Sequence, residues 1–145
     1  MIFDLQNLFA EGQAITATAI STNVIQWGAM GSTFQGSTLL REIGDGDPIK
    51  MAVQVNETFD NLTSLAITLE QADNAALSSS ADVLWSHSAL LAELVAGYQV
   101  PITVLPKRIT QEYLGLRFTV TGTNPAAGQI TAGIVAGVGT MVNAI

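Results

Sequence analysis

Four stretches of the chain alternate apolar and polar residues with a period of two, which is the pattern of a β-strand that buries one face. They are residues 48–59, 64–71, 113–121 and 128–137. A fifth stretch, residues 13–25, is rich in β-branched residues and is expected to divide near Ser21 into two strands. Shorter candidates at 83–86 and 101–105 bring the expected total to about eight strands.

One parity of the alternating stretches supplies the predicted hydrophobic core. Its members are large apolar side chains separated by polar ones, and they are Ile49, Met51, Val53, Val55, Leu65, Ile67, Leu69, Leu116, Phe118 and Val120. Residues 57–61 and 121–128 are short and polar, so each is predicted to close a hairpin. Helical periodicity is weak, and at most short helical turns are expected: one at 5–9, and either two turns or a bent strand at 88–95. The pattern therefore predicts an all-β protein, an antiparallel sandwich or barrel.

The length of 145 residues predicts one domain, residues 1–145, with an N-terminal arm over about residues 1–12 and an apolar C-terminal tail over about 138–145. Twelve acidic and five basic residues leave a net charge of −7, which disfavours nucleic acid as a partner. Charged residues make up 12% of the chain, whereas globular domains average about 25%, so part of the surface is expected to be covered in an assembly.

Compartment and membrane predictions follow from what the sequence lacks. The absence of cysteine excludes disulfides and thiolate metal sites, and it fits folding in a reducing cytosol. The opening residues carry no Lys or Arg, so a signal peptide is not expected. The 28 residues after Arg117 are uncharged, but glycines and Pro125 interrupt them, and we expect no membrane span.

Candidate chemistry is sparse. Residues 31–38 have the glycine spacing of a phosphate-binding loop, but Ser37 stands where that loop needs lysine, so a flexible polar loop is expected. Asp45 and Asp47, with Glu42 nearby, could gather a hard cation, but the spacing fails the EF-hand pattern and a plain turn is favoured. No metal site and no cofactor are predicted.

The single histidine, His87, limits acid–base chemistry to one imidazole. Its neighbours Ser86 and Ser88 would point to the opposite face of a strand, and no Gly-x-Ser-x-Gly motif is present. A half-buried strand histidine is therefore favoured over a catalyst. We expect no catalytic residues and no enzyme activity.

Taken in order, three blocks of the chain resemble the capsid cement (decoration) proteins of tailed bacteriophages. The blocks are residues 1–28, 41–106 and 108–135, and the most specific segments are GDGDPIKMAVQVNETF, EYLGLRFTVTGT and GQITAGIV. The tail VGTMVNAI runs on beyond the last shared block, so the resemblance says nothing of its role.

The resemblance implies a jelly-roll β-sandwich on the outer surface of the capsid, made in the cytoplasm of the bacterial host. Such proteins bridge major capsid subunits and associate with themselves, with a dimer favoured over a trimer. The family implies no catalytic residue. Two alternatives from other classes are a carbohydrate-binding jelly-roll module of a host-attachment apparatus and a small hydrolase. The first needs exposed aromatics or a calcium loop, and the second needs His87 beside a serine and a carboxylate.

The chain ends are the predicted contact surface. Apolar ends that fray in water are an aggregation hazard, so we expect a second copy or the capsid to cover them, although packing back on their own sandwich is the alternative. The predicted interface residues are the apolar side chains of the two ends: Ile2, Phe3, Leu5, Leu8, Phe9, Met141 and Ile145.

Overall fold

The computed structural model describes residues 2–28, 30–39 and 46–137. These residues form eight strands, and no helix occurs among them. The strands are β1 (Phe3–Ala14), β2 (Ala19–Ile20), β3 (Ile25–Gln26), β4 (Met51–Glu57), β5 (Leu62–Ala72), β6 (Asp82–Leu90), β7 (Tyr113–Gly122) and β8 (Gln129–Val135).

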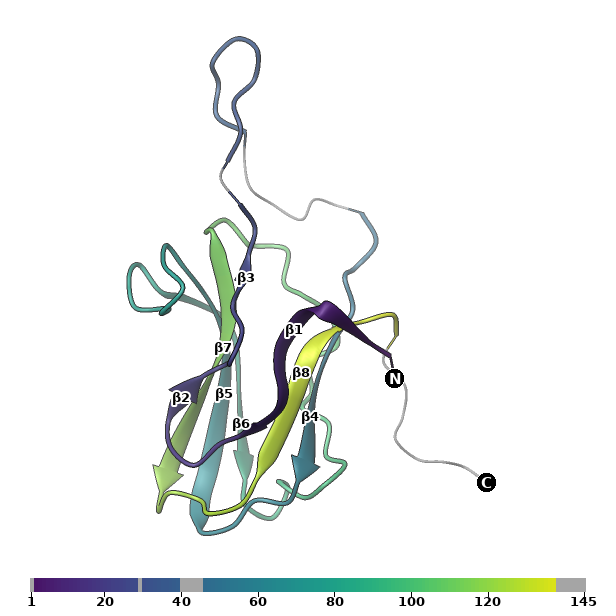
Figure 1. Cartoon of the computed structure of the whole chain (residues 1–145), viewed down its shortest axis with the longest axis vertical. Coiled ribbons are helices and arrows are strands. Elements are labelled where there is room, and N and C mark those ends of the chain that lie inside the picture. Colours follow the sequence, from purple (N-terminus) through teal and green to yellow (C-terminus); the bar gives the residue numbers. More distant parts are fainter. Residues whose placement is uncertain (1, 29, 40–45, 138–145) are drawn as a thin grey trace.

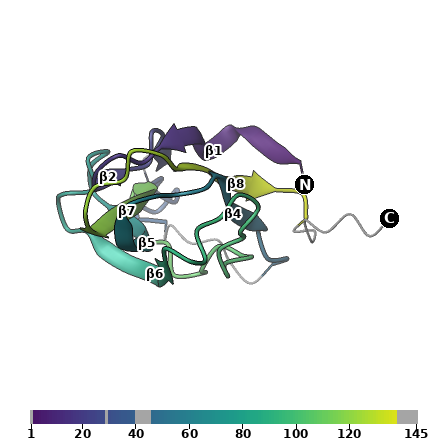
Figure 2. The same ribbon diagram turned by 90° about the horizontal axis from the view of Figure 1, so that it is seen from below.

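The strands form two antiparallel sheets that lie as two layers (Figures 1 and 2). One sheet has the order β1-β8-β4, and the other has the order β2-β7-β5-β6, with β3 also paired to β7. Residues 97–105 follow the free edge of β4 through backbone hydrogen bonds such as Val100 N to Val53 O, 3.0 Å. Along the sequence the chain passes repeatedly between the layers and ends with β8 beside β1. This is the connectivity of a jelly-roll-like β-sandwich, as predicted.

The core lies between the two layers, and the predicted core is confirmed. Eight of its ten members are buried, while Ile49 and Val120 are partly buried and pack against the others. Cross-strand pairs such as Leu69 with Leu116 and Ile67 with Phe118 point to the same side of their sheet, which is why one parity of each strand supplies the core.

The two predicted hairpins are wrong. Residues 57–61 connect β4 to β5 and residues 121–128 connect β7 to β8, and in both cases the two strands belong to different sheets. Asp60 ties the two crossings together, because its Oδ1 accepts hydrogen bonds from Ala126 N (2.7 Å) and Ala127 N (3.0 Å). A short polar link between two alternating stretches marks a reversal of the chain, but it does not say whether the strands pair.

Three further details differ from the sequence prediction. The first strand begins at Phe3, where an arm and a helical turn were expected. Residues 101–105 make backbone contacts with β4 without forming a full strand. The short strand expected at 83–86 extends over residues 82–90 and is followed by turns, so the start of the 88–95 segment is strand and not helix.

Gly128 provides a test of how tightly this end of the sandwich is packed. Its φ is +131°, and an added Cβ would lie 2.3 Å from Cδ1 of the buried Phe59 ring. We expect Gly128→Ala to lower the free energy of unfolding by about 1–3 kcal/mol through backbone strain and overpacking. Gly46→Ala is the control, because nothing lies within 4 Å of its added Cβ. Urea melts of equal midpoint for the two variants would contradict the packing described.

Candidate interaction surface

The N-terminal half of β1 departs from regular pairing with β8. Phe3 pairs with Val135 and Leu8 pairs with Gly133, so β1 uses more residues than β8 between the same two points. Residues 4–7 of β1 thus lie opposite a single residue of β8, Ile134, and form a bulge on an edge strand. Bulges of this kind re-aim side chains and prevent indiscriminate pairing along a sheet edge. This part of β1 is therefore built to present side chains outward.

Asp4 closes the bulge. Its Oδ2 accepts a hydrogen bond from Asn7 Nδ2 (2.6 Å), and its Oδ1 accepts one from the backbone N of Gln6 (3.0 Å). These two bonds, the Asn7 bond first, hold the pKa of the Asp4 carboxyl below its ordinary value of 3.8. The bonds fix the backbone on both sides of Leu5, so the position of Leu5 is set by the turn.

Ile2 and Leu5 are the exposed apolar residues of this edge, with 77% and 75% of their surface accessible. Phe3 is half-buried. Leu8 and Phe9 are buried within the chain, where Leu8 lies over Gly133 and Phe9 belongs to the core. Burial inside the monomer takes Leu8 and Phe9 out of the candidate surface. We call the remaining residues, Ile2, Phe3 and Leu5, the β1 edge patch.

The end of the described chain lies beside the β1 edge patch. Ala136 N donates to Ile2 O at 3.3 Å, directly after β8 ends. Met141 and Ile145, the predicted contact residues of the C-terminal tail, lie outside the described residues.

The pKa of Asp4 yields a pH prediction for the bulge. A carboxyl whose pKa is lowered by folding stabilises the structure above its unfolded pKa, and that contribution is lost as the pH falls through the lower, folded value. We therefore expect the Gln6 amide resonance to titrate with a midpoint below 3.8 and to lose this transition in Asp4→Asn. An NMR titration measures it. A wild-type midpoint at or above 3.8 would contradict the two hydrogen bonds.

His87 lies at the rim of the core, where β6 faces the segment beside β4. Its Nε2 is 3.1 Å from the Tyr98 hydroxyl, and its ring stacks on Trp85 with 6.0 Å between ring centroids. Burial, with Glu93 as a second cause, raises the pKa of Tyr98 above 10.0. Ser86 and Ser88 are on the opposite parity of β6. The described contacts of His87 are thus aromatic and phenolic, and they do not include the serine and carboxylate that a hydrolase would need.

The outer face of the β2-β7-β5-β6 sheet is nearly uncharged, which sequence reasoning did not identify as a surface. Its aligned rows follow from the register and consist mostly of short side chains: Leu90, Ser64 and Thr121; Ser88, Ala66 and Thr119; Ser86, Thr68 and Arg117. Arg117 is the charged member of these rows. Such a face can approach another protein closely without desolvating many charges.

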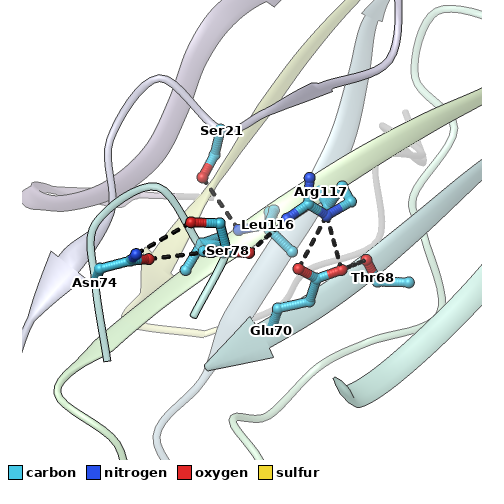
Figure 3. A network of polar contacts seen from close by, with 8 residues as sticks. Ser21, Thr68, Glu70, Asn74, Ser78, Leu116 and Arg117 are labelled. Atoms are coloured by element: carbon cyan, nitrogen blue, oxygen red, sulfur yellow. Dashed lines mark hydrogen bonds and ion pairs between the residues drawn. The ribbon is translucent and has the colours of Figure 1, made fainter. Parts of the chain in front are cut away.

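The charge of Arg117 is neutralised by the neighbouring Glu70 (Figure 3). Its Nε lies 3.0 Å from both carboxylate oxygens of Glu70, and its Nη2 donates to Leu77 O at 2.8 Å. Thr68 Oγ1 donates to Glu70 Oε1 at 2.8 Å. The Glu70 side chain is only 8% exposed, because the loop between β5 and β6 folds over this end of the face with Leu77 buried beneath it. The pair is therefore a largely buried one.

The candidate cation residues are only partly among the described residues. Asp47 is exposed, while Glu42 and Asp45 lie outside the described residues. Within the described ranges no three His, Cys, Asp or Glu side chains come together as a metal site would require. The same part of the chain contains no helix with the length and apolarity needed to cross a bilayer.

The class of protein that these features define is a small jelly-roll-like β-sandwich with uncharged and apolar surface at one sheet edge and on one sheet face. Residues 9–134 match the family model Bbp16. The match covers most of the chain, so the protein belongs to the Bbp16 family, a phage-associated family. No curated protein matches the chain.

Proposed function

We propose that this protein is a capsid cement protein of a tailed phage. In this proposal it binds the outer surface of the head, bridges major capsid subunits and associates with itself, with a dimer favoured over a trimer. The observation that carries the proposal is the β1 edge patch, where Ile2 and Leu5 are held outward by the bulge that Asp4 closes. An ordered apolar pair at a chain end is a typical protein contact surface.

Three other observations support a contact role on the outside of a shell. The chain belongs to a phage-associated family, and its sandwich carries a nearly uncharged sheet face. The net charge of −7 disfavours contact with packaged DNA, which supports a position outside the shell over one within it. No catalytic residue, cofactor, nucleic acid or membrane enters the proposal, and synthesis is assigned to the cytoplasm of the bacterial host.

The proposal is tested by adding purified protein to phage heads that lack it and measuring co-sedimentation. We expect the wild type to bind and to raise the temperature at which the heads release DNA. The double variant Ile2→Ser/Leu5→Ser should bind at least about tenfold more weakly, because truncated anchors at a contact centre have effects of this size. Binding driven by apolar contact should also persist when the salt concentration is raised.

The control for that experiment is Val95→Ser/Val104→Ser, which removes two partly exposed valines away from β1. It should bind within about twofold of the wild type, as peripheral contacts do. Wild-type protein that leaves the heads unbound, or that is released by moderate salt alone, would contradict the proposed function. Equal binding by the β1 edge variant would contradict the role given to Ile2 and Leu5.

A carbohydrate-binding module is the second candidate, and one observation favours it. Trp85 and His87 of β6 lie together with Tyr98, from the segment beside β4, at one rim of the sandwich. Trp85 and Tyr98 also pack against the core, so only part of each ring can stack on a sugar. Micromolar binding on a glycan array that is abolished by Trp85→Ala would favour this candidate over the cement protein.

A further inference from the structure

Residues 31–39 form a hairpin that projects beyond the end of the sandwich (Figure 1). Ser32 pairs with Thr38, and Leu39 N donates to Gly31 O at 2.9 Å. At the tip, Gly36 N donates to Thr33 O (2.9 Å) and Thr33 N donates to Ser37 O (2.8 Å). The glycine spacing that resembles a phosphate loop therefore serves a tight turn, in which Gly36 has a φ of +84°.

The tip of this hairpin carries an aromatic side chain that is not packed against the sandwich. Phe34 is fully exposed (relative accessibility 105%), and Met30 and Leu39 at the base are each about half exposed (51% and 50%). The sequence from 28 to 40 carries no charge. A large aromatic on a preformed turn loses little conformational freedom when it is buried, which makes it an efficient anchor for binding.

The surroundings of Phe34 restrict what could cover it. The hairpin points away from the sandwich, so its own core does not receive the ring. Without Lys or Arg, the segment lacks the charge that attracts nucleic acid or an anionic membrane surface. Because the neighbouring side chains are uncharged, the fitting partner is an apolar protein pocket with a polar, uncharged rim.

We propose that Phe34 inserts into such a pocket on the major capsid protein, an inference that rests on the proposed function. A protein that bridges shell subunits needs contacts at separated points, and the hairpin at residues 31–39 projects away from strand β1 (Figure 1). The hairpin is then a contact point with the shell protein that is separate from the β1 edge patch.

The test compares Phe34→Ala with Gln35→Ala, which alters the adjacent turn residue. Neither change removes a buried contact, so both variants should have the same melting temperature as the wild type. We expect Phe34→Ala to weaken binding to heads lacking the protein at least about tenfold and Gln35→Ala to stay within about twofold. Sedimentation of the free protein should give the same oligomeric mass for all three.

A photo-crosslinking p-benzoylphenylalanine at position 34 identifies the partner directly. On saturated heads it should yield a product containing one copy of this chain and one of the major capsid protein. If the wild type binds and Phe34→Ala binds equally well, the hairpin inference is wrong while the cement function stands. If the wild type itself does not bind, both fail. A crosslink only to a second copy, or loss of self-association in Phe34→Ala, would overturn the assignment to the shell protein.

Discussion

We expect Leu116→Ala to lower the free energy of unfolding by about 2–5 kcal/mol, since it truncates a fully buried side chain in the middle of the core. Leu116 lies on β7, a central strand, opposite Leu69 of β5. The backbone around it is held by Ser21, whose Oγ accepts from Leu116 N at 3.1 Å, so the cavity cannot easily collapse. Chemical denaturation measures the loss.

The matched control is Leu90→Ala, which makes the same chemical change at a leucine with more than half its surface exposed. It should change stability by less than about 0.5 kcal/mol. A loss below about 1 kcal/mol for Leu116→Ala would contradict the described burial, because core truncations of this size cost more.

The second large loss of folding stability is expected from Arg117→Met. The substitution removes both hydrogen bonds that Arg117 Nε makes to Glu70 and leaves that largely buried carboxylate without its cation. We expect a loss of about 2–4 kcal/mol, somewhat below the cost of breaking a fully buried pair, because the Arg117 side chain is partly exposed. Arg117 also donates to Leu77 O, so the loop between β5 and β6 should loosen.

A double-mutant cycle separates these contributions. Arg117→Met leaves the buried Glu70 carboxylate without a cation, and Glu70→Gln removes that charge. The double variant should therefore be more stable than Arg117→Met alone. Arg108, whose ion pair with Asp82 is exposed, supplies the control, and Arg108→Met should cost less than about 1 kcal/mol. A loss from Arg117→Met no greater than from Arg108→Met would contradict the buried network.

The strands of the core could be predicted from the sequence because alternation survives where pairing is regular. Leu65, Ile67 and Leu69 share one parity and one face. The start of β1 could not be predicted from alternation, because the bulge at residues 4–7 interrupts the regular in-and-out order of side chains between Phe3 and Phe9. The sheet partners of β4 and β5 were also missed, since the same turn residues serve a hairpin and a crossing between sheets.

Surfaces were harder to predict than strands. Ile2 and Leu5 could be found from their apolar character at a chain end, but Leu8 and Phe9 have the same character and are buried. The bulge separates them: Ile2 and Leu5 lie before or within residues 4–7, and Leu8 and Phe9 lie after it, where β1 pairs with β8 again. Glu70 has the parity of the outer face, yet its side chain is largely buried beside Arg117, which in turn donates to Leu77 O of the following loop. Burial that arises from contacts between residues distant in sequence cannot be predicted from a local sequence pattern.

The most direct test of the proposed function is cryo-electron microscopy of the virion at a resolution that allows chain tracing. The proposal predicts this sandwich on the outer surface of the shell, with the β1 edge patch and the hairpin at residues 31–39 both buried in contacts. Density for the chain inside the shell, in the tail or absent from the particle would contradict it.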